Sequence, residues 1–586
     1  MSRFGLSERF RVAAVKARRA RRAAASRLLG SRLLRWRYGP AAPRALLIAP
    51  QDMRARDESF WPEVQSGFLG LAGSVADFGD GSPFDAVPPG QAWLRAFHGF
   101  SWLRHLEAAV DEEADIWARD CVLHWIDRQQ SHPPVAFAPE VRARRIISWL
   151  SGASILLDTA EPDIVDAITR GLAAEVLALS AGWRTSETGA GRLTSLTALV
   201  LARLAFEDDE SQLDAVIALL LAEIDRQVLS DGGHISRNPA ALIDVLLDWL
   251  PLKTCFEVRN IRLPARLSAG IDRALGMLRY LRLGDGGIAR FNGMGIADPG
   301  ALATLMAYDD RPTPDWPIAP ASRYSRLASG STVVIVDVGS PPPLDDAGAA
   351  CAGVLSFEVS SGTSLLFVNV GAPGSPDADW RTLSRATASH TTACLGEVSS
   401  AQLVRAHGLG DMIEAPPLAL AGTVRADVRS DGMGQRLEAS HEGYAGRCGF
   451  IHRRNILLAE GGGRIEGADQ FEPVRRVAGA GEVSFALHFH LHPSVTATVL
   501  AEGMTSRTVR LMLVVGDGSH WLFEAEGARA TVEESTFLAS SSGPRPSLQI
   551  VLRGLSIGGS EITWSMTRQD DTPAEAAETE IENPRT

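Results

Sequence analysis

The residue periodicity of this 586-residue chain changes once, near residues 311–317, and this change constrains the fold more than any other feature. Before it, apolar residues recur at helical spacing, in blocks of roughly 12–20 residues separated by short glycine, proline or aspartate breaks. After it, several segments alternate in polarity or are rich in β-branched residues, namely 331–338, 354–359, 364–370 and 509–515. We therefore expect a multidomain α+β chain in which helices come first and antiparallel strands follow.

Helical hairpins recur about every 50 residues in the first half, which is typical of an α/α toroid or a stacked helical array. The predicted boundaries follow from these patterns and from the charge distribution. They are a basic N-terminal arm over residues 1–56, an α/α toroid over 57–315, an antiparallel β-sandwich over 325–569, and an acidic, disordered tail over 570–586.

Composition excludes several classes of protein. The formal net charge of −12 argues against nucleic acid as a partner of the whole chain. The five cysteines are odd in number, scattered and without a C-x-x-C motif, which predicts neither a disulfide framework nor a zinc site and fits a reducing compartment. No run of 18 apolar residues is present, so we expect no transmembrane helix. The sequence gives no indication of the oligomeric state.

The N-terminal arm is strongly basic. Residues 1–37 contain twelve arginines or lysines and a single acid, Glu8, and Arg18–Arg22 interrupts any apolar stretch that could serve as a secretory signal. Such a segment can form a basic helix that makes peripheral contact with an anionic membrane, or a solvated arm that packs on the body of the protein. We expect cytoplasmic synthesis and retention, with association at the inner membrane as one option.

One loop carries residues suited to binding an anion. The stretch 231–239 reads DGGHISRNP, and its end is a helix-start signal, because Asn238 is a good N-cap and Pro239 fits the first helical position. The glycines would bring His234 and Arg237 to a helix N-terminus, where unpaired N–H groups and the helix dipole attract negative charge. The alternative is an ordinary glycine turn followed by a helix cap.

A related stretch, 285–293, recurs 54 residues later and contains Arg290 and Asn292. It also leads to a helix start, at Asp298–Pro299. Two such loops on successive helical hairpins favour one cleft for an acidic ligand. Alternatively, both are capped turns.

Two further segments lie in the predicted β domain. The first contains Trp380, Arg381, Arg385 and His390, and arginine suits a carboxylated sugar because its planar fork pairs with a carboxylate through two hydrogen bonds. The second contains His488, His490 and His492, which would face one side of a strand. The competing interpretations are a polar strand with a buried histidine for the first, and a polar sheet face rather than a metal site for the second.

Together these motifs resemble the heparinase II/III-like family of polysaccharide lyases. The resemblance extends over most of the chain and rests on the order of five elements: LRAFHGFSWLR at 94–104, DGGHISRNP, GDGGIARFN at 284–292, LSFE at 355–358 and RATASHTT at 385–392. It implies an α/α toroid packed on an antiparallel β-sandwich, with the active site between them. It also implies β-elimination on a uronate-containing acidic polysaccharide, and a periplasmic or cell-envelope location as the alternative to the cytoplasm.

The implied chemistry needs a group that neutralises the uronate carboxylate, a base for the C5 proton and an acid for the leaving oxygen. By resemblance, His234 meets the carboxylate, and Arg237, Arg290 and His390 complete the expected catalytic set. Arg385, Arg381, Trp380, Asn238 and Asn292 are expected to bind substrate, with no cofactor.

The chain departs from the family pattern at several positions. The His-x-His pair of full-site members corresponds to Ala349 and Cys351, and an expected aspartate corresponds to Asn369, so His390 alone does not make a zinc site and we predict no bound metal. The family's tyrosine has no obvious counterpart, and the nearby aromatic residues are Phe291, Tyr280, Tyr308 and Tyr324. The alternative function is therefore a catalytically degenerate glycan-binding or envelope-assembly protein on the same scaffold.

Overall fold

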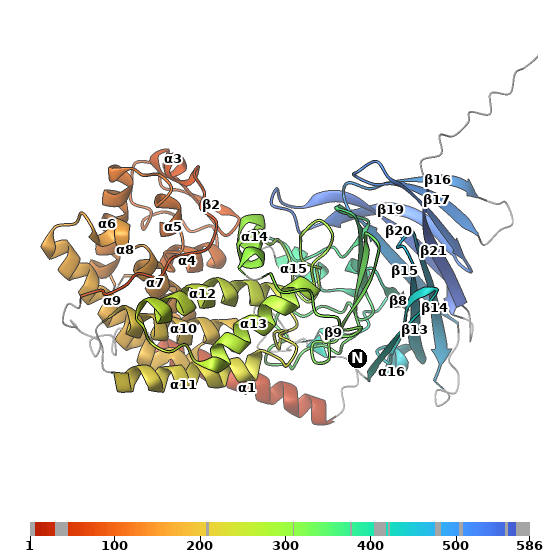
Figure 1. Ribbon diagram of the computed structural model, residues 1–586, viewed down its shortest axis with the longest axis horizontal. Helices are drawn as coiled ribbons and strands as arrows, with labels where there is room; N and C mark the ends of the chain where they lie inside the picture. The colour runs from red at the N-terminus through yellow and green to blue at the C-terminus, as the bar shows by residue number, and fades with distance from the viewer. Residues whose placement is uncertain are drawn as a thin grey trace, which may run out of the picture.

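The computed structural model describes residues 6–29, 45–129, 131–206, 210–308, 310–374, 378–403, 418–419, 422–474, 482–502, 508–556 and 561–569. Figure 1 shows a helical half, coloured red to yellow-green, that lies beside a half built of strands, coloured green to blue. The predicted order of helices followed by antiparallel strands is confirmed. The predicted acidic tail over 570–586 falls outside the described residues.

The helical half begins with a long helix and continues through a series of paired helices. Its helices are α1 (Leu6–Leu29), α3 (Phe60–Gln65), α4 (Gln91–His98), α5 (Leu103–Leu106), α6 (Glu112–Asp127), α7 (Pro139–Ser151), α8 (Ala153–Leu157), α9 (Pro162–Gly182), α10 (Ala190–Ala205), α11 (Glu210–Gln227), α12 (Pro239–Val258), α13 (Ala265–Tyr280) and α14 (Pro299–Ala307). Short elements join them, namely η2 (Pro134–Phe137), η3 (Trp183–Thr185) and a hairpin of β1 (Phe68–Leu71) and β2 (Ser74–Asp77).

Local sequence explains where these helices start. The predicted cap at Asn238 is confirmed, because its side chain accepts a hydrogen bond from the Ala240 N–H at 2.9 Å and Pro239 occupies the first turn of α12. Asp298 caps α14 in the same way through the Ala301 N–H at 2.7 Å. Both loops singled out in the sequence therefore end at helix N-termini.

The second half is built of antiparallel strands. They are β3 (Tyr324–Ser329), β4 (Thr332–Asp337), β5 (Phe357–Ser361), β6 (Ser364–Leu365), β7 (Phe367–Val368), β8 (Ala393–Leu395), β9 (Gln402–Leu403), β10 (Leu418–Ala419), β11 (Val424–Asp431), β12 (Gly434–His441), β13 (Phe450–Ala459), β14 (Arg464–Pro473), β15 (Val483–Leu491), β16 (Thr496–Glu502), β17 (Val509–Val514), β18 (His520–Glu526), β19 (Arg529–Phe537), β20 (Arg545–Ser556) and β21 (Glu561–Gln569). In the described part of this half, short helical elements interrupt the strands, namely α15 (Ala378–Leu383), η4 (Thr387–Ser389) and α16 (Ala445–Cys448).

Most of these strands form two large sheets and a smaller one, and β9 and β10 pair separately with each other. The eight-stranded sheet has the order β11-β12-β13-β14-β21-β18-β17-β16, and the five-stranded sheet has the order β19-β20-β15-β7 with β8 also on β15. A four-stranded sheet, β3-β4-β5-β6, lies at the start of the β half. Apolar side chains from all three sheets share one buried core, as expected for sheets packed face to face.

Three of the four predicted strand segments form strands over most of their length, whereas 354–359 is extended only from Phe357 onward. The reason is local. Leu355 has a positive φ of 59°, and its N–H donates to the Asp337 carbonyl at 2.8 Å instead of joining a ladder.

The two halves are packed against each other rather than loosely linked. The buried cluster that fills the helical half also contains Tyr324, Ile335, Leu365, Val368 and Phe537 from the β half. A continuous apolar core across the junction favours a fixed arrangement of the two domains. Within the described part of the chain, no helix is both long enough and apolar enough to cross a membrane.

Candidate functional site

The two glycine-containing loops are the same turn built twice. Gly232 and Gly286 both have φ of +88°, and in each turn the preceding aspartate accepts a hydrogen bond from the following glycine, at 3.0 Å for Asp231 and 2.9 Å for Asp285. Gly232 is required sterically as well, because a Cβ there would lie 1.9 Å from the Arg273 carbonyl oxygen. The resemblance between the two stretches is therefore structural.

His234 lies in the first loop and is enclosed on both sides. Its Nε2 lies 2.8 Å from Gln227 Oε1, and its Nδ1 lies 2.7 Å from Ser236 Oγ and 3.1 Å from the Ser236 N–H. The Gln227 amide nitrogen donates to the Gly189 carbonyl and to Glu223, so the oxygen of that amide faces the imidazole. His234 Nε2 must therefore carry the proton, and Nδ1 accepts.

Burial fixes the charge of this imidazole. His234 is 2% exposed, and desolvation, with a smaller contribution from the nearby Arg226, lowers its pKa to about 4. At neutral pH the side chain is uncharged, with hydrogen-bond partners at both nitrogens. In this conformation it has neither the charge nor a free nitrogen with which to meet a carboxylate.

Arg237 spans the junction of the two domains. Nε donates to the Ser322 carbonyl at 2.8 Å, and the two terminal nitrogens reach the carbonyls of Arg323 and Ser340 at 3.3 and 3.1 Å. The same nitrogens pair with Asp337, with a shortest N–O distance of 2.6 Å. A guanidinium has five N–H groups, and here five acceptor contacts engage them.

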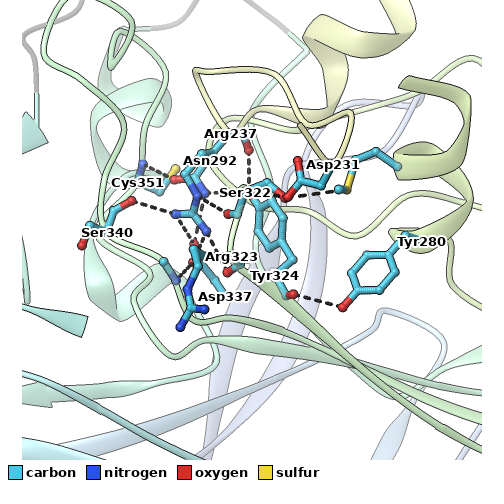
Figure 2. A network of polar contacts seen from close by, with 12 residues as sticks. Asp231, Arg237, Tyr280, Asn292, Ser322, Arg323, Tyr324, Asp337, Ser340 and Cys351 are labelled. Atoms are coloured by element: carbon cyan, nitrogen blue, oxygen red, sulfur yellow. Dashed lines mark hydrogen bonds and ion pairs between the residues drawn. The ribbon is translucent and has the colours of Figure 1, made fainter. Parts of the chain in front are cut away.

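Tyr324 lies at the centre of the same network (Figure 2). Its hydroxyl donates to the Arg237 carbonyl and accepts from the Asn292 amide at 2.9 Å. Asn292 also donates to Asp337 at 3.0 Å, and its oxygen lies 3.5 Å from the Cys351 N–H. Burial raises the pKa of Tyr324 well above its usual range, so the phenol remains protonated.

We call Arg237, Asn292, Tyr324 and Asp337 the junction cluster. The sequence pointed to the first two, and it named Tyr324 only as a nearby aromatic. Asp337 was missed, although one signal could have found it: a single acid ends the apolar strand β4, which reads TVVIVD. A carboxylate in such a position needs a buried cation.

Arg290 occupies the second loop. It pairs with Glu358 at 3.2 Å, and its guanidinium lies 5.1 Å from the centre of the Phe537 ring. Glu358 is fully buried, and burial raises its pKa although Arg290 opposes the shift. Arg290 therefore neutralises an internal carboxylate in this conformation.

The segment that contains His390 is linked to this loop through Asn369. Asn369 donates to the Arg290 carbonyl at 3.2 Å and accepts from the Thr391 N–H at 3.0 Å. His390 is 3% exposed, its Nδ1 lies 2.8 Å from the Ala386 carbonyl, and burial lowers its pKa to about 4. The negative charge of Asp337 opposes that shift.

The remaining candidates have different surroundings. Arg385 is buried and donates to the carbonyls of Ala350 and Ala347 at 2.8 and 3.4 Å. Trp380 and Arg381 are half-buried on α15. Asn238 serves as the helix cap described above. The structure thus gathers Arg237 and Asn292 into one cluster, places His390 near it, and gives His234 a separate set of partners.

The residues present do not fit the zinc that some family members hold. Among the described residues, no group of three or more His, Cys, Asp or Glu side chains is arranged to hold a metal ion. Cys351 is buried, and burial raises the pKa of its thiol to about 11, whereas a zinc ligand must be a thiolate. Asn369 uses both amide atoms in the hydrogen bonds given above.

The three alternating histidines are individually partnered. His488 lies 3.0 Å from Gln549, and His490 lies 2.9 Å from Ser535 and 2.8 Å from the Ala388 carbonyl. His492 lies just beyond the end of β15, and its Nδ1 is 2.8 Å from Ser494 Oγ. These contacts agree with a polar face of the sheet.

A polar pocket of about 380 Å³ opens beside His492. Both domains contribute to its wall, which consists of Asp285, Thr363, Ser364, Leu365, His492, Ser494, Gly516 and Asp517. Among the described residues that line it, none is an arginine or lysine. Hydrogen bonds from Ser519 lower the pKa of Asp517, and burial, with a smaller contribution from Arg290, lowers that of His492 to about 4, so Asp517 is charged and His492 is neutral at neutral pH.

Comparison with known proteins agrees with this architecture. Residues 311–565, most of the β half, match the family described as heparinase II/III-like, C-terminal. The fold is similar to the crystal structure of heparinase III, with a TM-score of 0.64 and 14% identity over 83% of this chain and 80% of that one. It is also similar to a mutant of the heparan sulfate lyase HepC from Pedobacter heparinus, with a TM-score of 0.60 and 14% identity over 89% and 85% of the two chains.

The chain is also similar over most of its length to a protein that is not named as a lyase. FtsZ-localized protein C from Caulobacter vibrioides (strain NA1000 / CB15N) is 28% identical over 544 residues, which cover 90% of this chain and 91% of that protein. The two lyase structures, at 14% identity, establish the fold and not the activity.

Proposed function

We propose that this chain, whose β half matches the heparinase II/III-like family, is a non-catalytic glycan-binding protein that takes part in cell-envelope assembly at the division site. The observation that carries the proposal is the state of His234, Arg237 and Tyr324. Each is buried, and each has its hydrogen-bonding atoms engaged by other groups of the protein. A lyase needs these chemical groups free to meet the substrate.

The relative named FtsZ-localized protein C supports the second part of the proposal, because it aligns over nearly the whole chain. We extend to this chain a place at the FtsZ-containing division site, with cytoplasmic synthesis and retention. Peripheral contact between the basic arm and an anionic membrane surface belongs to the same proposal. Location at the division site, and its loss on FtsZ depletion, are to be measured with a fluorescent fusion in the native bacterium.

A place for a glycan to bind is offered by the polar pocket. Its wall supplies two carboxylates, three hydroxyl groups and one imidazole, a set that accepts hydrogen bonds from sugar hydroxyl or amino groups. The pocket lies at the junction of the two domains, as ligand sites often do.

The competing function is β-elimination on a uronate-containing polysaccharide. It is favoured by the meeting of Arg237, Asn292 and Tyr324 at the junction between the helical and β domains, with His390 nearby. Tyr324 would be the general acid or base and Arg237 the electrostatic support. For this, the Tyr324 hydroxyl must leave the Arg237 carbonyl, and the guanidinium must give up part of its pairing with Asp337.

One experiment separates the two functions. Folded protein is incubated with heparan, alginate and chondroitin-type polymers, and the absorbance of the unsaturated uronate product is followed. Binding of these polymers and of a glucosamine oligomer is measured in parallel by calorimetry. Heparinase III serves as the positive control. The proposal expects saturable binding of the glucosamine oligomer and no product from any of the polymers, whereas product formation that is lost in Tyr324→Phe would establish the lyase instead.

A further inference from the structure

The basic N-terminal helix α1 packs on the body of the protein. Val15 is 3% exposed, and α1 contacts η3 of the helical half. Figure 1 shows α1 running along the edge of the helical half toward the strands. The helix therefore has a defined resting place, although much of its surface, including Arg21, is exposed.

Two arginines of α1 reach a loop of the other domain. Arg18 pairs with Asp345 at 2.6 Å, and Arg19 lies 3.4 Å from the carbonyl oxygens of Leu344 and Asp345. These acceptors belong to the loop 340–351 between β4 and β5. Because α1 contacts η3 of the helical half and this loop of the β half, it bridges the two.

The same loop covers the turn that carries His234. Thr188 donates to the Asp345 carbonyl at 3.0 Å, and Asp346 pairs with Arg226 at 3.5 Å. A Cβ built on Gly189 would lie 3.8 Å from Asp346 and 3.9 Å from the His234 ring. Loop 340–351 is thus stacked over Gly189, which in turn lies against His234.

Some buried polar atoms where loop 340–351 packs on the helical half lack hydrogen-bond partners. Asp345 Oδ1, Asp346 Oδ1 and Arg192 Nε are buried and have no hydrogen-bond partner among the described residues. Buried polar groups without partners disfavour the state that contains them. The ion pair that holds the loop from outside is partly exposed, at 49% for Arg18 and 26% for Asp345, and such pairs are weak and screened by salt.

We propose that α1 is a strap that holds loop 340–351 closed over the His234 turn, and that release of α1 opens this end of the domain junction. Closure places a β-domain loop against Gly189 and His234, and Arg18 and Arg19 hold that loop from the solvent side. The opened recess would expose Asp346 Oδ1 and Arg192 Nε, which have no hydrogen-bond partner among the described residues, to a ligand. Only that last consequence rests on the proposed function, because the strap itself is a property of the fold.

The test is hydrogen exchange on the full chain. Arg18→Glu reverses the charge that meets Asp345, and Arg21→Glu makes the same change at an exposed position of the same helix. We expect Arg18→Glu to raise deuterium uptake severalfold in residues 342–350 and 187–189, and Arg21→Glu to leave both segments unchanged. Adding Asp345→Arg to Arg18→Glu restores an ion pair of opposite polarity and should recover protection.

Two outcomes would overturn the strap. In the first, uptake rises within α1 itself but not in 342–350, so the helix leaves without opening the loop. In the second, Arg18→Glu and Arg21→Glu behave alike. A second measurement needs no mutation. Protection of residues 342–350 from hydrogen exchange in the unaltered protein should fall as the salt concentration is raised, and constant protection would contradict the proposal. Neither readout depends on glycan binding, so the proposed function can fail while the strap stands.

Discussion

Arg237 and Asp337 join the helical and β domains through an ion pair of 2.6 Å between side chains that are only 7% and 5% exposed. The two residues are 100 positions apart in the chain. Both carboxylate oxygens accept from the guanidinium, and Asn292 donates to one of them. The pair therefore neutralises two buried charges at the point where the domains meet, which gives the junction cluster a structural role whatever its chemistry.

Removing one member of this pair should destabilise the protein strongly. We expect Arg237→Ala to cost about 3–5 kcal/mol, because it leaves Asp337 charged and buried. The free energy of unfolding by denaturant is the measurement. The control is Arg429→Ala. Arg429 and its partner Asp427 are 72% and 63% exposed, so this substitution should cost no more than about 1 kcal/mol. Equal effects of the two substitutions would contradict the assignment.

The repeated glycine turn allows a matched comparison. Gly232 and Gly286 share a φ of +88°, but a Cβ at Gly232 would lie 1.9 Å from a backbone oxygen, whereas at Gly286 the nearest atom is 3.1 Å away and belongs to the flexible Arg282 side chain. Gly286→Ala should therefore cost about 1–2 kcal/mol, and Gly232→Ala on the order of 3 kcal/mol or more. A thermal melt of both variants decides, and a smaller effect at Gly232 would refute the steric argument.

These two positions also show what a sequence can and cannot predict. Rules that act within a few residues predict the turns, the helix caps at Asn238 and Asp298, and the change from helices to strands. The structure contains all of these features. The partner of Arg237 does not follow from such rules, because Asp337 comes close only when two domains pack.

The same limit applies to His234. Its loop was expected to present the imidazole to a ligand, and the residue that engages Nε2 is Gln227 at the end of α11. Gln227 faces it because its amide nitrogen is taken by the Gly189 carbonyl and Glu223. The orientation of the Gln227 amide depends on α11, Gly189 and the His234 loop coming together. No local sequence pattern encodes that orientation.

The buried histidines predict a specific dependence of stability on pH. Burial depresses the pKa of His234 and of His390 to about 4 in the folded state, whereas an unfolded histidine titrates near 6.5. Above about pH 6.5 both states are neutral and stability is complete. As the pH falls toward 4 only the unfolded state binds protons, so stability falls, by about 3 kcal/mol for each group.

His234→Asn removes one of these groups. The slope of unfolding free energy against pH between 4 and 6.5 should be shallower in this variant than in the parent protein. The comparison uses slopes, so a general loss of stability does not affect it. Identical slopes would show that His234 is not held neutral by burial.

The polar pocket should select sugars by charge. Its described lining contains two carboxylates and no cationic side chain, so it should bind glucosamine more tightly than glucose and reject glucuronate. Asp517→Asn should weaken glucosamine binding about tenfold, the value of one charge-assisted hydrogen bond. Asp431→Asn, at the last residue of β11, is the control. Calorimetry that finds glucuronate preferred would overturn this assignment and favour a site for acidic glycans elsewhere.

The last prediction concerns zinc. A zinc site needs three or four deprotonated or neutral donors around one point. Here the Cys351 thiol is held protonated by burial and contacts the Ala349 carbonyl, and Asn369 uses its amide atoms on Thr391 and the Arg290 carbonyl. His390 also commits its Nδ1 to the Ala386 carbonyl, which leaves one nitrogen and no partner donor of sufficient affinity. Elemental analysis of protein purified without added metal should therefore find far less than one zinc per chain. About one zinc per chain, lost in His390→Ala, would refute this and would require the junction to rearrange around a metal.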